Sequence, residues 1–315
     1  MKTKKIFKFF VFFDLVILIA LAAFLFLNPE KQKIDANVRN IPSGDFVELS
    51  QGFVHYELSG APEGELVVLV HGFSVPYYVW DPTVDELVKQ GFQVLRYDLY
   101  GRGYSDRPEA EYNLEFFTTQ LSDLTTALIP GESFHIMGLS MGGPIVASFA
   151  NQHPDLIKSV TIIAPEVLPV SEEDIFPMNV PLLGEWIVGV YLVPFHLPQS
   201  QLDDFYHPQD FPGWEEKYRE QLQYKGFKNA ILSTIRNLVT FNPLEVYESL
   251  NKSGLPTFLI WGKEDQSVSY AAIVELMERL PNVESIFIDE TGHLPHYEKA
   301  ELVNPMIIQF LQNIP

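Results

Sequence analysis

The chain has no cysteine in its 315 residues. This absence excludes disulfide bonds, thiolate nucleophiles, cysteine-bound metals and a lipidated N-terminal cysteine. Basic residues are scarce as well: 21 Lys and Arg stand against 41 Asp and Glu, which gives a formal net charge of −20. Such a charge repels the phosphate backbone of nucleic acids, and the sequence beyond the N-terminus contains no basic patch that could reverse this. We therefore expect no nucleic-acid partner.

Sequence motifs that bind metals or nucleotides are also missing. The histidines outside the motifs described below are scattered without the spacing of metal ligands: His55, His135, His153, His196 and His207. A Gly-x-Gly pair at Gly101 and Gly103 lacks the third glycine and the opening helix of a dinucleotide site. We expect neither a bound metal nor a nucleotide cofactor.

A long apolar segment lies near the N-terminus, where four lysines precede a run from Phe9 to Leu27. As a helix with a rise of roughly 1.5 Å per residue, this run is about 28 Å long, close to the roughly 30 Å hydrocarbon core of a bilayer. Its one charge, Asp14, costs at most about 3 kcal/mol, whereas about fifteen Leu, Ile, Val and Phe contribute about −0.3 to −0.6 kcal/mol each. We predict that residues 1–28 form a single-pass membrane anchor.

The alternative to an anchor is a cleaved signal peptide, which would release a secreted protein. Ala20-Leu21-Ala22 has the small-x-small form of a cleavage site, but apolar residues continue beyond it from Phe24 to Leu27, which favours the uncleaved anchor. The lysines before the run outnumber the two after it, which acidic residues offset. The N-terminus is therefore expected in the cytoplasm and the rest of the chain outside it.

Beyond a polar linker at residues 29–45, the pattern is that of an α/β protein. A hairpin is predicted from strands at 46–49 and 53–58. Short apolar runs then alternate with amphipathic helical stretches; the runs lie at 66–70, 94–97, 134–137, 160–163, 257–261 and 285–288. This alternation predicts a mostly parallel sheet covered by helices on both faces. With 47% hydrophobic residues, the chain can fill one large core and a satellite domain.

One connection is much longer than the dozen or so residues that a parallel crossover needs. We interpret residues 165–254 as an inserted cap that divides the core into 46–164 and 255–315. The insertion is rich in aromatic residues and proline, a composition suited to a mainly helical lid over an apolar cleft. The alternative is that these aromatic residues form the ordinary core of a small subdomain.

The segment Gly138-Leu-Ser140-Met-Gly142 matches the G-x-S-x-G nucleophile elbow. It follows the strand that ends at Met137 and precedes a helical stretch from Pro144 to Gln152, which is the context that the motif requires. By itself the pattern arises by chance in roughly one chain of this length in ten. A tight strand–helix turn whose serine only caps a helix is the alternative.

Two further side chains stand where a predicted strand ends. Asp265 follows the strand ending at Trp261, and His293 follows the last strand. The chain order Ser, Asp, His is that of the α/β-hydrolase triad, and all three positions fall at the carboxyl edge of the sheet. We predict Ser140 as the nucleophile, His293 as the base and Asp265 as the acid that orients the base.

With these motifs, the chain from about Phe46 to Leu311 resembles the α/β-hydrolase superfamily, in the lineage of serine esterases, monoacylglycerol lipases and carbon–carbon bond hydrolases. The segment from His71 to Phe73 resembles the family's oxyanion loop, and the segment from Asp98 to Asp106 resembles its strand-4 turn. The resemblance implies that the backbone amides of Phe73 and Met141 form the oxyanion hole.

Other residues compete for these roles or support them. His296 is an alternative base, and Glu166, just beyond the strand ending at Ile163, is an alternative acid. His71 is expected to brace the oxyanion loop, and Asp98 to fix its turn by hydrogen bonds.

A serine at the elbow favours acyl transfer, so the predicted function is a carboxylic ester hydrolase that forms an acyl-enzyme on Ser140. The anchor and the apolar cap favour lipophilic substrates. The alternatives are a carbon–carbon bond hydrolase of dienoic acids, with Arg219 and Arg236 as candidates to bind the carboxylate, and a cofactor-free perhydrolase. A membrane-anchored binding module without catalysis is the alternative from another class. Within the cap, the apolar stretch Val180 to Val193 is expected to line an acyl pocket or to touch the membrane.

Overall fold

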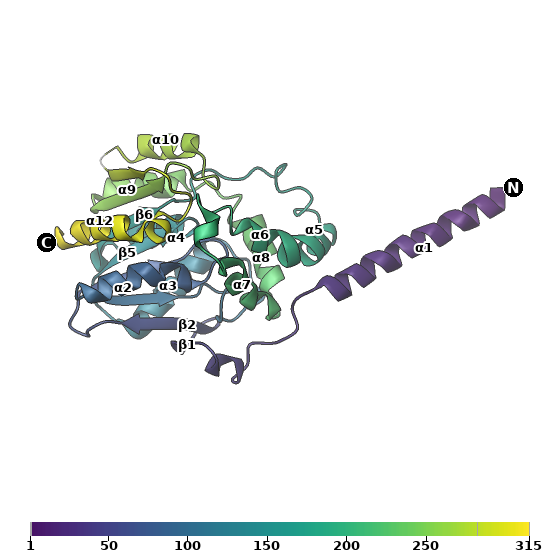
Figure 1. Ribbon diagram of the computed structural model, residues 1–315, viewed down its shortest axis with the longest axis horizontal. Coiled ribbons are helices and arrows are strands. Elements are labelled where there is room, and N and C mark those ends of the chain that lie inside the picture. Colours follow the sequence, from purple (N-terminus) through teal and green to yellow (C-terminus); the bar gives the residue numbers. More distant parts are fainter. Residues whose placement is uncertain (1, 282, 315) are drawn as a thin grey trace.

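The computed structural model describes residues 2–281 and 283–314. Helix α1 (Lys2–Leu27) projects from one side of a globular part formed by the rest of the chain (Figure 1). The apolar stretch Phe10–Leu27 is long and apolar enough to cross a membrane, and none of it is buried inside the protein. The predicted N-terminal apolar helix is therefore confirmed as a helix.

The globular part is built on an eight-stranded sheet in the order β1-β2-β4-β3-β5-β6-β7-β8. The strands are β1 (Asp45–Leu49), β2 (Gly52–Ser59), β3 (Leu66–Val70), β4 (Gln93–Tyr97), β5 (Phe134–Leu139), β6 (Ile157–Ile163), β7 (Thr257–Gly262) and β8 (Glu284–Ile288). The first two strands form the predicted antiparallel hairpin, with Val47 opposite Val54, and β2 also pairs antiparallel with β4. Strands β3 to β8 pair in parallel, so the mostly parallel sheet is confirmed.

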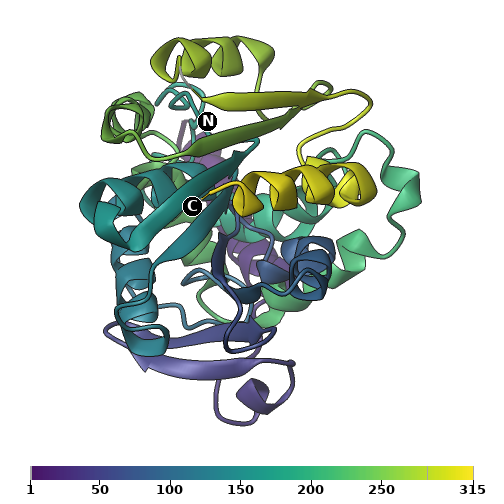
Figure 2. The same ribbon diagram turned by 90° about the vertical axis from the view of Figure 1, so that its left-hand side faces the viewer.

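Helices cover both faces of this sheet, as Figure 2 shows. One layer contains α2 (Asp81–Lys89), α11 (Pro295–Glu298) and α12 (Ala300–Gln312); the other contains α3 (Leu114–Leu128), α4 (Gly142–Gln152), α9 (Leu244–Ser253) and α10 (Tyr270–Arg279). Because both faces are covered, the inner strands are apolar throughout: every residue of β3 and β5 is buried.

Side-chain caps start two of the core helices. The side chain of Asn113 accepts a hydrogen bond from the Phe116 amide at the start of α3, and Ser269 does the same with the Ala272 amide at the start of α10. Short 3-10 turns complete the fold at Val38–Asn40, Tyr77–Trp80, Pro154–Leu156, Pro208–Asp210 and Glu220–Gln223.

The segment between β6 and β7 contains helices in the described structure: α5 (Leu183–Ile187), a π-helix (Val188–His196), α6 (Leu197–Ser200), α7 (Trp214–Arg219), α8 (Phe227–Asn237) and α9. Most of them lie on the side of the molecule from which α1 projects (Figure 1). Helix α9 instead packs on the core helix α4, where the Asn151 side chain donates to the Val246 carbonyl (2.9 Å). The predicted cap range 165–254 thus also contains the crossover helix that leads into β7.

Candidate active site

Ser140 stands at a sharp turn between β5 and α4. Its backbone has a φ of 53°, in the left-handed region that side chains rarely adopt, and such strain is typical of functional turns. Both flanking glycines are required sterically, because a Cβ at Gly138 would clash with the Gly142 carbonyl and a Cβ at Gly142 would clash with the carbonyl of Val70. The predicted strand–turn–helix context of the motif is confirmed.

His293 and Asp265 meet at the carboxyl ends of neighbouring strands. The Nδ1 of His293 lies 2.8 Å from Oδ2 of Asp265. The other carboxylate oxygen of Asp265 accepts hydrogen bonds from the amides of Ser267 and Val268, and the Trp261 indole donates to Oδ2. Since the carboxylate only accepts here, the hydrogen-bond network assigns the proton of the neutral ring to Nδ1 and leaves the lone pair of that form on Nε2.

The charge state of His293 depends on three carboxylates. Burial lowers the pKa of His293, but Asp265, Asp204 and Glu298 together raise it to about 9. The imidazolium form is therefore stabilised at neutral pH, and the neutral form that can accept a proton becomes populated as the pH rises.

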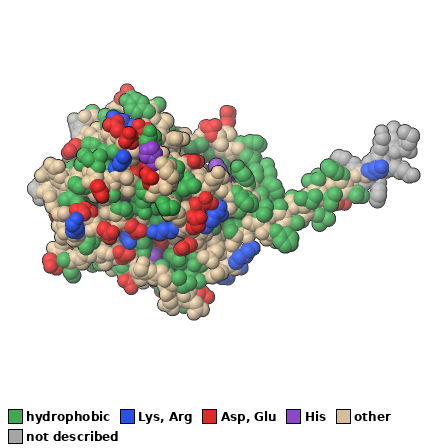
Figure 3. All heavy atoms as spheres, viewed as in Figure 1, with side chains coloured by type: hydrophobic (Ala, Val, Ile, Leu, Met, Phe, Trp, Pro, Cys, Tyr) green, Lys and Arg blue, Asp and Glu red, His purple; other side chains and the backbone are tan. Residues whose placement is uncertain are grey.

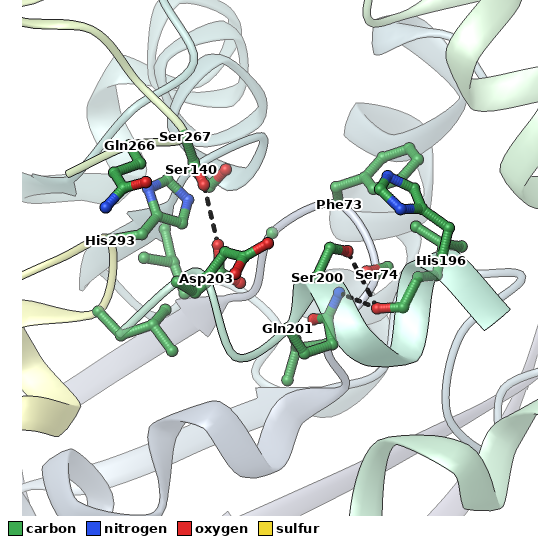
Figure 4. Close-up of a pocket in the computed structure, with 16 residues that line it drawn as sticks. Phe73, Ser74, Ser140, His196, Ser200, Gln201, Asp203, Gln266, Ser267 and His293 are labelled. Carbon is green, nitrogen blue, oxygen red and sulfur yellow. Dashed lines mark hydrogen bonds between the residues drawn. The ribbon is translucent and has the colours of Figure 1, made fainter. Parts of the chain in front are cut away.

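Ser140 and His293 line one cavity of about 540 Å³, and Figure 4 shows both among its lining residues. Gly72 brings the loop after β3 against the same serine: a Cβ built on it would lie 3.0 Å from the Ser140 Cβ and 3.5 Å from its Oγ. The structure thus brings the predicted nucleophile, the base with its acid, and the predicted oxyanion loop to one place.

The loop that carries Phe73 is fixed by buried side chains. The Leu99 amide donates to Nε2 of His71 (2.9 Å), so Nδ1 carries the proton and donates to the Gly72 carbonyl (2.9 Å). Burial lowers the pKa of His71 to about 4, which keeps the ring neutral. The Arg102 Nε donates to the Phe73 carbonyl at 2.8 Å. The bracing role predicted for His71 is confirmed by these contacts.

Met141 follows Ser140 directly in the chain, and Phe73 lines the same cavity as Ser140. Among the interactions of the described residues, none uses the Phe73 amide or the Met141 amide as a donor. They are therefore available to an oxygen atom bound beside Ser140.

The alternative base His296 and the alternative acid Glu166 lie in other environments than His293 and Asp265. His296 packs against the Trp80 ring, its Nε2 lies 3.1 Å from the Val79 carbonyl, and burial lowers its pKa to about 3. Glu166 contacts Ser140 through its backbone amide, which donates to the Ser140 carbonyl (3.1 Å). Burial raises the pKa of its carboxyl to about 8, so that group is largely neutral at pH 7. The carboxylate that contacts His293 is that of Asp265, as predicted.

Asp98 fixes the turn after β4. Its carboxylate accepts from the amides of Tyr77 and Tyr104 at 2.9 Å each and pairs with Nδ1 of His55 at 2.8 Å. These contacts confirm the structural role predicted for it.

A second cavity, of about 700 Å³, meets the first at Phe73, Ser140 and His293. Its walls are mostly apolar: Val167, Leu168, Pro169, Val170, Ile175, Met178, Leu192, Leu197, Ile235 and Val239. The first cavity has a mixed and more polar lining, in which Ser74, Ser200, Gln201, Asp203 and Asp204 lie beside Val75, Leu139 and Leu294; Gln266 and Ser267 line both cavities. Ser140 therefore lies in the wall of both an apolar chamber and a more polar one, which we call the polar chamber.

No sequence pattern pointed to the polar residues that the cap contributes to the site, among them Asp204. The Asp204 carbonyl accepts from the His293 amide (2.7 Å), and its carboxylate accepts from the Ser267 hydroxyl at 2.9 Å, the contact dashed beside Ser267 in Figure 4. These residues lie in an irregular stretch without periodicity or motif, so only the folded chain shows that they face the site.

Arg219 and Arg236, the candidates to bind a substrate carboxylate, do not line either cavity. Arg219 pairs with Glu215 (2.6 Å), and Arg236 pairs with Glu185 at 2.7 Å. Both guanidinium groups are thus engaged in ion pairs within the cap.

Comparison with known proteins decides the family. The family model described as "alpha/beta hydrolase fold" matches residues 65–300. The chain belongs to the α/β-hydrolase family.

Relatives of this α/β hydrolase include the AB hydrolase superfamily protein YfhM of Bacillus subtilis, which is 26% identical over 85% of this chain and 97% of the relative. Lipase 3 of a Moraxella species is 27% identical over 86% of this chain and 84% of the lipase. Among solved structures, a membrane phospholipase A described as a bacterial virulence factor superposes with a TM-score of 0.69 at 23% identity, over 98% of this chain and 99% of the other. The chain is thus a member of a hydrolase family, and its relatives include a lipase.

Proposed function

We propose that this α/β hydrolase is a membrane-anchored serine hydrolase that cleaves carboxylic esters of lipophilic acids through an acyl-enzyme on Ser140. The observation that carries the proposal is that Ser140 and His293, whose ring is bonded to Asp265, both line the apolar chamber and the polar chamber. An ester whose two halves differ in polarity fits this pair of chambers. The acyl chain would lie in the apolar chamber and the alcohol in the polar one.

The first chemical step is attack by the Ser140 hydroxyl on the ester carbonyl. The Nε2 of His293 takes the hydroxyl proton while the new bond between Oγ and the carbonyl carbon forms, and the carbonyl electron pair moves to oxygen. Asp265 holds the ring in the required tautomer and stabilises the imidazolium.

The oxyanion formed in this step needs donors that are already in place. The Phe73 and Met141 amides supply them, and each donor of this kind is worth about 10² to 10³ in rate. Collapse of the intermediate breaks the bond to the alcohol, which takes the proton from His293. Water then repeats the sequence on the acyl-enzyme and releases the carboxylic acid.

The anchor assignment is part of the same proposal. We place α1 across a membrane with its lysine-rich N-terminus in the cytoplasm and the cap (residues 165–254) and core outside it. The superposition of the membrane phospholipase A over 98% of this chain, α1 included, supports this assignment.

Hydrolysis of a carbon–carbon bond in dienoic acids is less well supported, because both candidate arginines are paired with glutamates away from the chambers. The test is a series of p-nitrophenyl esters of increasing acyl length, assayed beside a dienoic ring-fission product. The proposal predicts ester turnover that rises with acyl length and is lost in Ser140→Ala. Turnover of the ring-fission product alone would overturn it.

A further inference from the structure

The end of the anchor helix is in direct contact with the cap. The Trp186 indole N–H donates to the Ala20 carbonyl at 2.9 Å. The Phe24 ring packs on Gly189, where a Cβ would come within 2.8 Å of it, and the Lys228 ammonium lies 4.6 Å from the centre of the same ring. Figure 1 shows this end of α1 beside α5.

The segment after α1 strengthens this attachment. The Glu30 carboxylate accepts from the Lys228 amide (2.7 Å), and the amides of Lys31 and Gln32 donate to the Gln223 carbonyl. Anchor and cap are therefore joined at several points, so the depth of the anchor in a bilayer fixes the depth of the cap.

That depth follows from the positions of the contacts along α1. Ala20 lies seven residues before Leu27, the end of the apolar span, which is about 10 Å at 1.5 Å per residue. A cap residue that bonds to Ala20 thus lies about as deep as amphipathic interfacial helices reach, roughly 5–10 Å into the boundary between headgroups and acyl chains.

The cap is apolar where it would meet this boundary. The exposed apolar side chains in and just before α5 and the π-helix, the two elements that contact α1, form what we call the cap patch: Val180, Leu182, Leu183, Tyr191 and Phe195. Leu182 is 84% exposed and Tyr191 is 57% exposed. The charge within this stretch, Glu185, is paired with Arg236. Figure 3 shows hydrophobic side chains gathered where α1 leaves the globular part.

We infer that the cap patch is a second membrane-contacting surface, which inserts into the leaflet that surrounds the end of α1. This inference rests on the anchor assigned in the proposed function. An apolar surface of this kind is costly in water and is stabilised in the acyl region of a bilayer. Trp186 and Tyr191 are of the types enriched at membrane interfaces.

The inserted segment also forms a wall of the apolar chamber. Within the π-helix, Tyr191 and Phe195 face outward, while Leu192 and His196 line the chamber next to Ser140. Only one helix thickness therefore separates the leaflet from the chamber. The substrates that fit this arrangement are esters with acyl chains already in the membrane, which enter the chamber beside this helix.

The absence of cysteine allows a direct test by single-cysteine labelling of the full chain. Leu18→Cys reports on the anchor, Leu182→Cys and Phe195→Cys on the cap patch, and Leu302→Cys on α12, a core helix away from α1 (Figure 1). Leu302 is a matched control because it is an exposed leucine, 48% accessible. Each variant carries a bimane and is reconstituted in phosphatidylcholine vesicles that contain nitroxide-labelled lipid.

The inference predicts strong nitroxide quenching at positions 18, 182 and 195 and none at 302. If position 18 is quenched but positions 182 and 195 are quenched no more than position 302, the inference is overturned and the assignment of α1 as an anchor is retained. Absence of quenching at all four positions would overturn the anchor as well.

Activity provides an independent readout. Leu182→Asp should lower hydrolysis of a long-chain ester embedded in vesicles by roughly tenfold, because an aspartate is expelled from the apolar part of the bilayer. Its turnover of a short, soluble p-nitrophenyl ester should stay at the wild-type value, and Leu302→Asp should change neither. Equal vesicle activity in Leu182→Asp and Leu302→Asp would contradict the inference.

Discussion

The core and the cap line the same cavities, but they hold their side chains by different kinds of contact. In the core, the Asp265 carboxylate accepts hydrogen bonds from two backbone amides and an indole in addition to its contact with His293. In the cap, the carboxylate of Asp204 is held by the hydroxyl of Ser267, and Asp204 lies in a turn between α6 and the 3-10 turn Pro208–Asp210, outside any helix. Under the proposed function, the closely held core residues carry out the chemistry, and the cap residues select and admit the substrate.

The most decisive test of the catalytic role proposed for the core is removal of the nucleophile. Ser140→Ala should lower kcat by on the order of 10⁶ while the fold is kept, because the loss of a serine nucleophile of this type removes the covalent route. Steady-state ester hydrolysis and circular dichroism measure the two quantities. A residual kcat within tenfold of wild type would place the nucleophile elsewhere.

Loss of the orienting charge should cost less. Asp265→Asn should lower kcat by about 10⁴, because the ring of His293 loses both its tautomer preference and the charge that stabilises the imidazolium. Thermal unfolding should show that the variant is folded. If turnover is unchanged, Glu166 becomes the candidate acid again.

A substitution in the cap should change the preference for acyl-chain length and leave the chemical step unchanged. Leu192→Trp fills part of the apolar chamber, so we expect kcat/KM for a long-chain ester to fall roughly 5- to 150-fold, which corresponds to an overpacking cost of about 1–3 kcal/mol. Acetate esters should be unaffected. Tyr191→Trp, at the neighbouring outward position, is the matched control. Equal losses for short and long esters would contradict the assignment of the acyl chamber.

The smallest effect is expected at the contact between the two regions. Because carboxylates raise the pKa of His293 to about 9, kcat/KM should increase with pH until the imidazolium has lost its proton. Asp204→Asn removes one negative charge, which destabilises the imidazolium and lowers this pKa. The acid limb of the pH profile should therefore move to lower pH, and an unchanged or upward-shifted limb would show that Asp204 does not act on His293.

The same comparison explains what could be predicted from the sequence. The strands, the elbow and the Ser140, Asp265 and His293 positions were predictable because each depends on a local pattern next to a buried strand. The role of α9 was missed because a helix that packs on α4 and one that covers the site have the same amphipathic pattern. Asp204 was missed because its position depends on tertiary contacts with Ser267 and His293, which no local pattern encodes.

The central claim is that Ser140 is activated by His293 and attacks a carbonyl. The most direct measurement is the site of reaction with a fluorophosphonate, located by mass spectrometry of the full-length protein after digestion, at pH values on both sides of the His293 pKa. The account predicts one adduct, on Ser140, that forms faster as the pH rises and disappears in Ser140→Ala. A folded protein that stays unlabelled, or an adduct on another residue, would contradict it.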